Sequence, residues 1–246
     1  MLSSDRHRAS FGIETFAPAV AARDTPTAPA RTRAANEFRS LFVRGGVVRQ
    51  ANGSSLLELG GTKVLCSVHG PRSGTRVDFS ESAVLQCEFK FATFCSASFD
   101  QQHMQDDEDR KLSLALQQAL SAAVLLDRYP KSVIDVSVLV LQSSGSTLAA
   151  AITAASVALA AAGIAMRDVV TCATVAVLGT DDDASLALDP DENDERADRC
   201  AGLVTVALMP SLNEITLLDL HGDVSYASTV ASIELFWTDA TACASM

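Results

Sequence analysis

The sequence predicts a mixed α+β fold rather than a doubly wound one. Segments of helical periodicity lie between strand-like runs, and short connections that suit hairpins stand on both sides of them. The 246 residues are 48% hydrophobic, which suffices for one sizeable core or for two small lobes packed together. Each expected element is justified by its own local pattern.

The first half of the chain begins with a predicted hairpin. Residues 41–50 and 55–60 are expected to pair as strands around Asn52-Gly53, a dipeptide that favours tight hairpin turns. Residues 63–69 form the next expected strand, which should stop at Gly70-Pro71. Residues 84–91 follow as a partly alternating strand.

The middle of the chain holds two expected helices. Residues 95–109 are polar and predict a loop, whereas Leu and Ala recur at helical spacing over 111–126. Tyr129-Pro130 should end this helix. A β-branched strand at 133–141 and an alanine-rich helix at 147–162 come next.

The last third alternates apolar strands with an acidic segment. An apolar run predicts a strand over 169–178, and the acid-rich residues 181–198 predict a solvated loop. Strands are expected at 203–209 and 214–220, separated by Pro210. A helix should begin near Ala227 and run to about Trp237.

Residues 1–36 differ from the rest of the chain. They are rich in Ala, Arg, Pro, Ser and Thr, which predicts a disordered N-terminal extension before one domain at 37–246. A mitochondrial transit peptide would also be basic and rich in serine, but Asp5, Glu14 and Asp24 weaken that alternative. Whether the extension carries a targeting signal stays open.

Charge and cysteine usage restrict the function classes. A net charge of −11 argues against a protein that binds RNA strongly by itself, because such binding depends on neutralising phosphates. The six cysteines show no Cys-x-x-Cys spacing, so we expect buried free thiols in a reducing compartment. No apolar run is long enough to predict a membrane span.

The connection between the 133–141 strand and the 147–162 helix is the most informative part of the chain. A strand, a small-residue turn and a helix N-terminus form a ready anion site, because the first backbone N–H groups of a helix are unpaired. The turn reads Ser143-Ser144-Gly145-Ser146-Thr147. No cation stands in it, and Leu148 occupies the place where a charged anchor is expected.

This segment resembles the RNase PH family, in which active members carry Leu-Gln-x-x-Gly-x-Thr-Arg-x-Ala-x-Ile-Thr. The resemblance covers roughly residues 38–235, because several spaced motifs recur in the family's order. Those motifs are 49–54 (RQANGS), 60–71 (GGTKVLCSVHGP), 141–153 (LQSSGSTLAAAIT), 162–168 (AGIAMRD) and 206–210 (VALMP). The resemblance implies a single domain with helices packed against mixed β-sheets. Within the family, the chain is most similar to a catalytically inactive ring subunit of the eukaryotic RNA exosome. The expected domain, 37–246, would end in a helix shorter than that of active relatives.

The resemblance also implies that catalytic features are missing. In active members the arginine at the position of Leu148 holds the inorganic phosphate that attacks the RNA 3′ end, so Gly145, Ser146, Thr147 and Leu148 form a degenerate phosphate site. The family's two catalytic aspartates align with Asp198 and Val204, or with Ala197 and Leu203 if the register slips by one. Neither alignment restores the pair.

Acidic residues elsewhere do not replace these features. Asp189, Asp191 and Asp194 lie nearby, but an acidic run with Asn and Pro is typical of a solvated loop rather than a metal site. The family's RNA-gripping arginine pair aligns with Asp107 and Glu108, whose charge repels a phosphate backbone. These acids instead suit the start of the helix that follows. We expect no metal and no cofactor.

Three cations are the remaining candidates for RNA contact. Arg72 and Arg76 follow Gly70-Pro71, and Lys90 lies on the next strand. They are candidates to face RNA in a ring pore, with ordinary exposed loop charge as the plainer alternative.

The sequence therefore predicts a non-catalytic structural subunit of the exosome core ring. It would support RNA 3′-end processing, including that of rRNA, and 3′-to-5′ decay in nucleus, nucleolus and cytoplasm. Its partners would be other RNase PH-like subunits, S1/KH-type cap subunits and RNA in the pore. The alternatives are an active phosphate-dependent 3′-to-5′ exoribonuclease that uses relocated residues such as Asp191, Asp194 or Asp198, and a diverged subunit of another ring position.

Overall fold

The computed structural model describes residues 33–73, 81–95, 107–179, 185–195 and 200–244, with side chains placed as far as Trp237. All of these residues belong to one compact unit that begins at Arg33. The expected extension therefore lies outside the described residues as far as residue 32.

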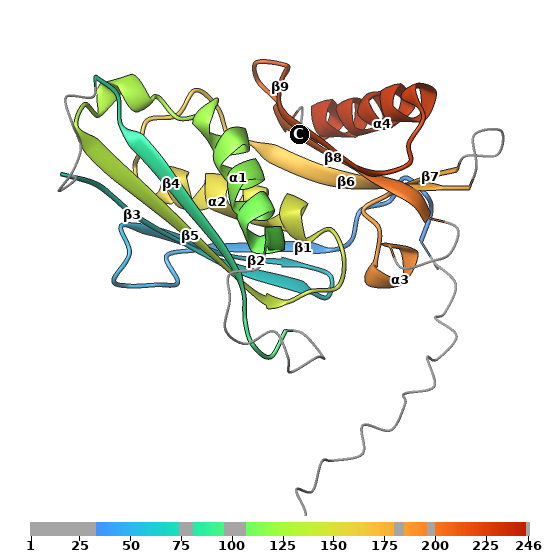
Figure 1. Ribbon diagram of the computed structural model, residues 1–246, viewed down its shortest axis with the longest axis horizontal. Coiled ribbons are helices and arrows are strands. Elements are labelled where there is room, and N and C mark those ends of the chain that lie inside the picture. The colour runs from blue at the N-terminus through green and yellow to red at the C-terminus, as the bar shows by residue number, and fades with distance from the viewer. Residues whose placement is uncertain (1–32, 74–80, 96–106, 180–184, 196–199, 245–246) are drawn as a thin grey trace, which may run out of the picture. The chain divides into compact units, whose positions relative to one another are not determined.

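A five-stranded sheet forms the first layer (Figure 1). Its strands are β1 (Leu41–Gly45), β2 (Gly53–Leu59), β3 (Thr62–Ser73), β4 (Val84–Phe91) and β5 (Ser132–Gln142), in the order β1-β2-β3-β5-β4. Only β4 and β5 pair in parallel, while the other pairs in this sheet are antiparallel. The predicted pairing of the first two strands is confirmed, because Gly45 at the end of β1 is in register with Ser55 of β2. The expected bounds are wrong: β1 ends at Gly45 rather than at residue 50, and Gly53 is the first residue of β2, so residues 46–52 form the connection in place of a tight Asn52-Gly53 turn.

A four-stranded antiparallel sheet forms a second layer. It contains β6 (Thr171–Leu178), β7 (Ser185–Leu188), β8 (Cys200–Met209) and β9 (Glu214–Gly222), in the order β7-β6-β8-β9. Two strands, β7 and β9, therefore form the edges of this sheet.

Two helices fill the space between the sheets (Figure 1). They are α1 (Asp107–Ser121), which packs against β4 and β9, and α2 (Thr147–Ala161), which packs against β2, β3 and β6. A short 3-10 turn, η2 (Leu126–Arg128), follows α1, and α3 (Glu192–Glu195) follows β7. The last helix, α4 (Tyr226–Ala244), covers the opposite face of the four-stranded sheet (Figure 1). None of the described helices is long and apolar enough to cross a membrane.

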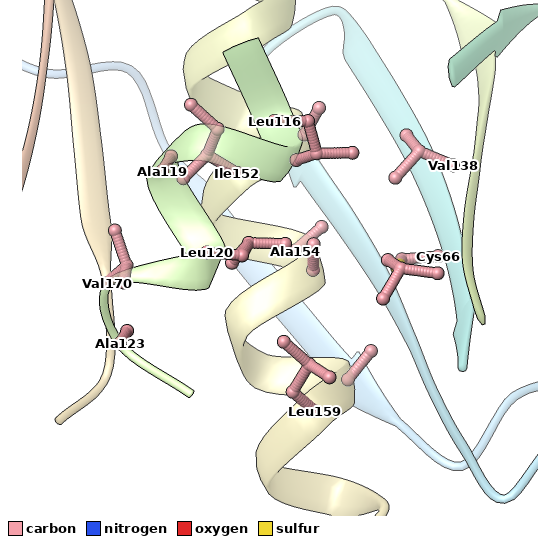
Figure 2. Packing of buried hydrophobic residues seen from close by; sticks show 14 of the residues in the cluster. Cys66, Leu116, Ala119, Leu120, Ala123, Val138, Ile152, Ala154, Leu159 and Val170 are labelled. Carbon is pink, nitrogen blue, oxygen red and sulfur yellow. The ribbon is translucent and has the colours of Figure 1, made fainter. Parts of the chain in front are cut away.

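The main core lies around α2, because this helix is mostly apolar and ten of its fifteen residues are buried. Figure 2 shows Leu116 and Leu120 of α1 beside Ile152 of α2, all fully buried. At Gly53 the backbone of β2 approaches α2 so closely that an added Cβ would lie 2.3 Å from the carbonyl oxygen of Ala158. The alanine-rich sequence of α2 permits this close packing, which holds the C-terminal end of the helix against β2.

The mixed α+β fold with packed helices is confirmed, with local corrections. The strand expected to stop at Gly70-Pro71 continues to Ser73, because β3 passes an irregularity there and pairs again with β5. The helix that precedes Tyr129 spans Asp107–Ser121 and begins within the expected loop. The expected 181–198 loop contains the strand β7 and the helix α3.

Five cysteines whose side chains the structure places are free thiols: Cys66, Cys87, Cys95, Cys172 and Cys200. Cys66 is fully buried, whereas the other four are half-buried. Burial raises the pKa of the Cys66 thiol far above its ordinary value, and the nearby Cys87 adds to the shift. These cysteines are therefore poor nucleophiles.

Candidate functional site

The turn that joins β5 to α2 has a left-handed backbone. Gly145 has φ +92 and Ser146, the N-cap residue of α2, has φ +52. A Cβ on Gly145 would lie 2.5 Å from the carbonyl oxygen of Pro190, so the turn packs directly against the segment before α3. The Ser146 hydroxyl donates a hydrogen bond of 3.2 Å to the same carbonyl oxygen. This turn, residues 143–147, is the strand–turn–helix anion site that the sequence predicts.

A carboxylate of the protein itself accepts a hydrogen bond from one backbone N–H group of this turn. The Ser146 N–H donates a hydrogen bond of 2.7 Å to Oε1 of Glu195, the last residue of α3. Burial raises the pKa of the Glu195 carboxyl, while this hydrogen bond and the Arg39 charge oppose the increase. A negative charge at the N-terminus of a helix is favourable, so Glu195 lies where an external anion would gain the same interaction.

A buried ion pair holds the opposite side of the turn. Arg39 precedes β1, and its Nε and Nη2 donate hydrogen bonds of 2.8 and 2.6 Å to the two carboxylate oxygens of Asp189. The Arg39 backbone N–H donates a third, of 3.0 Å, to Oδ2 of Asp189. Arg39 is 8% exposed and Asp189 is 2% exposed, so this bidentate pair lies out of solvent.

The guanidinium of Arg39 faces the carbonyl groups of the turn. Its Nη1 donates a hydrogen bond of 2.8 Å to the Ser144 carbonyl oxygen, and its Nη2 donates one of 3.2 Å to the Gly145 carbonyl oxygen. The Thr62 hydroxyl also donates a hydrogen bond, of 2.8 Å, to Gly145. With Asp189 and two carbonyl groups as partners, Arg39 has its donors committed within the protein and does not replace the missing phosphate-binding arginine.

A second arginine extends this network toward the surface. Arg33 forms an ion pair of 3.0 Å with Asp191, and Arg39 Nη1 lies 3.4 Å from the same carboxylate. The carbonyl oxygen of Ala35 accepts a hydrogen bond of 2.8 Å from the Leu188 N–H. Residues 33–39 are therefore attached to the segment that carries Glu195, although 33–36 belong to the extension expected from composition.

Leu148 belongs to the hydrophobic core. It is 8% exposed and belongs to the main core cluster around α2. Thr147 beside it exchanges a hydrogen bond of 3.0 Å with the Ser143 hydroxyl. The four residues of the expected degenerate phosphate site, Gly145, Ser146, Thr147 and Leu148, are thus brought together and packed against their own chain.

The residues expected at the acidic site are not brought together in the described structure. Val204 lies in β8, fully buried, in register with Val175 of β6. Asp198 lies outside the described residues. Glu195 is the acid placed at the turn, and alignment with the family motif did not single it out. In the described ranges no group of three or more His, Cys, Asp or Glu side chains could hold a metal ion.

Two of the three candidate RNA-binding cations already have acidic partners. Arg72 forms an ion pair with Asp135, and Lys90 forms one with Glu88. All four side chains remain partly exposed, so these ion pairs are weak and solvent-screened. Arg76 lies outside the described residues. The local charge around Arg72 and Lys90 is therefore close to neutral.

An apolar cavity of about 480 Å³ lies beside the Arg39–Asp189 pair. Its lining includes Phe38, Leu57, Leu59 and Phe236. Since Arg39 and Asp189 neutralise each other, the cavity offers apolar contact and no free charge. Cys172 also lines the cavity, and burial raises the pKa of its thiol far above the ordinary value.

Comparison with known proteins agrees with this architecture. The model of the 3′ exoribonuclease family, domain 1 (RNase PH), matches residues 37–165. The exosome complex component MTR3 of Homo sapiens is 38% identical over 227 residues, covering 87% of this chain and 82% of that protein. The corresponding Schizosaccharomyces pombe component is 38% identical over 224 residues, covering 90% and 86%.

A solved structure shows the same fold. The crystal structure of Rrp46 from rice (Oryza sativa) superposes with a TM-score of 0.74 at 23% identity, covering 87% of this chain and 95% of that one. The resemblance to RNase PH-like exosome subunits that the motifs predict is thereby confirmed. The chain belongs to the RNase PH branch of the 3′ exoribonuclease family.

Proposed function

We propose that this protein is a non-catalytic structural subunit of the RNA exosome core ring. The observation that carries the proposal is the hydrogen bond from the Ser146 N–H to the Glu195 carboxylate, at 2.7 Å. Phosphorolysis needs inorganic phosphate at this turn, and a resident carboxylate occupies the same donor. Phosphate would have to displace a bound anion and then approach its negative charge.

The other groups around the turn support the same conclusion. Leu148 fills core space where active relatives carry the phosphate-binding arginine, and Arg39 is committed to Asp189. Moving Arg39 to a phosphate would leave a carboxylate that is 2% exposed without its cation. Such an uncompensated buried charge costs several kcal/mol, on the order of 3–5.

The proposed role is architectural support for RNA 3′-end processing, including that of rRNA, and for 3′-to-5′ decay. The relatives named above are exosome components, and we extend that assembly to this chain. Its neighbours would be other RNase PH-like subunits, with S1/KH-type cap subunits on the ring and RNA in the pore. The complex would act in nucleus, nucleolus and cytoplasm.

Direct RNA contact by this subunit is proposed as secondary. Arg72 and Lys90 would have to release Asp135 and Glu88 to neutralise RNA phosphates. These exposed ion pairs cost little to break, so passing RNA can still be contacted weakly. The salt dependence of RNA binding by the complex should therefore change little when both cations are replaced by alanine.

The experiment that tests the proposal is reconstitution with the other RNase PH-like proteins of the source organism. RNA degradation is assayed for the chain alone and for the complex, with and without inorganic phosphate. We expect stable co-purification and no phosphate-dependent release of nucleoside diphosphates that depends on this chain.

Variants of the acidic segment distinguish the structural subunit from an active phosphate-dependent exoribonuclease. Complexes carrying Asp191→Ala, Asp194→Ala, Asp198→Ala or Glu195→Ala should degrade RNA at the wild-type rate, because none of these carboxylates acts in chemistry. Phosphate-dependent degradation by the chain alone, abolished by one of these changes, would establish the active exoribonuclease instead.

A further inference from the structure

The negative charge of this protein is confined to one part of the sequence. Residues 168–246 contain 15 acidic and 2 basic residues, whereas residues 1–167 contain 15 acidic and 17 basic residues. Residues 168–246 include the four-stranded sheet and α4. The C-terminal part of the sequence therefore carries the net negative charge, while the net charge of the remainder is close to zero.

The edge strand β9 carries a row of exposed apolar side chains. Ile215, Leu218 and Leu220 are 41%, 42% and 49% exposed. In the antiparallel pairing with β8 they are in register with Leu208, Val206 and Val204, respectively. The three apolar residues therefore extend, on the same face of the sheet, the row of β8 side chains that α4 buries.

Only part of this face is covered. The helix α4 packs over β6, β7 and β8, whose apolar residues form the second core cluster (Figure 1). Val204 and Val206 are fully buried, while their cross-strand neighbours Leu220 and Leu218 remain close to half exposed. Because β9 is the last strand of the sheet, its outer backbone edge is also available for pairing within the described part of the fold.

Acidic side chains lie at both ends of this apolar row and on the opposite face of β9. Glu214 begins β9, Asp219 lies between the two leucines on the opposite face, and Asp223 follows the strand. All three are exposed or half-exposed, and none forms an ion pair among the residues that the structure describes. A partner at this edge must therefore match apolar contacts at the centre and supply positive charge around them.

We propose that the β9 edge (Glu214–Gly222) docks a protein subunit that presents an extended apolar strand flanked by Lys or Arg side chains. The partner would add a strand beside β9, with its apolar residues covering Ile215, Leu218 and Leu220. This inference rests on the proposed function and assigns which edge of the chain receives one neighbour. It also assigns the chemistry of that neighbour.

The charge distribution excludes two other occupants of the edge. RNA phosphates would be repelled by Glu214, Asp219 and Asp223, and RNA offers no strand to pair with β9. A second copy joined through β9 would bring the same acidic residues face to face across a two-fold axis. Like charges in such an arrangement oppose association.

The test uses the full chain co-expressed with the RNase PH-like proteins of its source organism. The dissociation constant of the complex is measured for wild type, for Leu220→Asp and for the control Leu139→Asp. Leu139 is a similarly exposed leucine, at 36%, on β5 of the other sheet. We expect Leu220→Asp to weaken binding at least tenfold and Leu139→Asp to change it less than twofold.

A charge reversal tests the second part of the inference. Asp219→Lys should weaken binding of the partner. The affinity of the wild-type chain should fall as the salt concentration rises from about 50 to about 500 mM, because salt screens the attraction between complementary charges. Hydrogen exchange on the wild-type complex gives a readout that needs no variant, because residues 214–222 should become protected when the partner binds.

Each outcome decides between the proposals. A partner that binds wild type and Leu220→Asp equally, with residues 214–222 unprotected, overturns the docking site and leaves the structural role intact. If no RNase PH-like protein binds wild type, both proposals are overturned. Protection of β9 by RNA alone, or by dimerisation of this chain, also overturns the assignment of a basic protein partner.

Discussion

Replacing Arg39 by methionine should destabilise the fold strongly. The change retains most of the side-chain volume and removes the charge that faces Asp189, a carboxylate that is 2% exposed. The side-chain hydrogen bonds of 2.8 and 2.6 Å to Asp189 are lost, although the Arg39 backbone N–H still donates one of 3.0 Å. Removing one partner of a buried ion pair costs about 3–5 kcal/mol.

The carbonyl groups of the turn should add little to this cost. The Gly145 carbonyl oxygen keeps the hydrogen bond from the Thr62 hydroxyl, at 2.8 Å, and the Ser144 carbonyl oxygen keeps the one from the Glu192 N–H, at 3.2 Å. The estimate therefore stays at about 3–5 kcal/mol, since no carbonyl is left unpaired. For a chain of this size it corresponds to a decrease in Tm of roughly 6–20 °C.

The effect should depend on pH in a defined direction. Burial alone would raise the pKa of Asp189, but the hydrogen bonds and charge of Arg39 hold it below its ordinary value. The stabilisation from the pair is therefore fully present above the carboxyl pKa of the unfolded chain, about 4. It is lost as pH falls through the lowered pKa of the folded state. The stability gap between wild type and Arg39→Met should narrow in acid.

Urea unfolding followed by circular dichroism measures these differences. Arg33→Met is the comparison variant, because Arg33 forms its shorter ion pair, of 3.0 Å, with the more exposed Asp191 and lies 3.8 Å from the Asp189 carboxylate, which keeps Arg39 as its closer cation. This change should cost about 1 kcal/mol. The double variant Arg39→Met/Asp189→Leu should recover most of the lost stability, since it leaves no unpaired charge. A cost below about 1 kcal/mol for Arg39→Met at pH 7, or no recovery in the double variant, would refute the reasoning.

Three further predictions concern the turn and the core. Gly145→Ala should destabilise by at least about 2 kcal/mol, because φ is +92 and the new methyl would meet backbone atoms. The control Gly163→Ala, with φ +71 and open space around the Cβ, should cost about 1 kcal/mol in the same thermal unfolding assay. Because the pKa of Glu195 is raised in the folded state, wild type should gain stability relative to Glu195→Gln as pH falls from neutral toward the ordinary carboxyl pKa of 4.5. An unchanged difference between the two across this range would contradict the burial of that carboxyl. Cys66 should resist a thiol reagent in native protein and react only on unfolding, as mass spectrometry of labelled peptides would detect, and labelling in the native state would contradict the packing.

Local patterns predicted the elements whose signals are contained within a few residues. The β-branched run of β5 and the alanine-rich sequence of α2 identify both elements; the predicted bounds differ by one residue at each end of β5 and by one residue at the C-terminal end of α2. The Asn52-Gly53 dipeptide lies next to the connection of the first hairpin, although Gly53 itself is the first residue of β2. In each case neighbouring residues alone determine the conformation.

Elements that depend on distant partners could not be predicted in this way. The four residues of β7 lie in an acidic run, and they form a strand because they pair with β6. Likewise β3 continues beyond Gly70-Pro71 because β5 supplies partners on its far side. Long-range pairing overrides local preference at both places.

The sequence predicts the turn of the candidate site but not the Glu195 contact, because that contact depends on long-range pairing. The turn and the absence of a cation are visible in residues 143–148, because they are contiguous. The Glu195 contact joins residues 49 positions apart and depends on the pairing of β7 with β6 and on the position of α3. Only the folded chain shows which of several neighbouring acids reaches Ser146.

The Glu195 contact makes the turn independent of the phosphate concentration around it. A site that waits for a ligand changes its charge and its order when the ligand arrives, so its geometry follows the ligand concentration. Here the counter-charge for the α2 N-terminus is part of the polypeptide, present at a fixed ratio of one per chain. The packing of α2 between the two sheets should therefore stay the same whether phosphate is scarce or abundant. A component of this kind keeps a constant shape while the phosphate concentration around it varies.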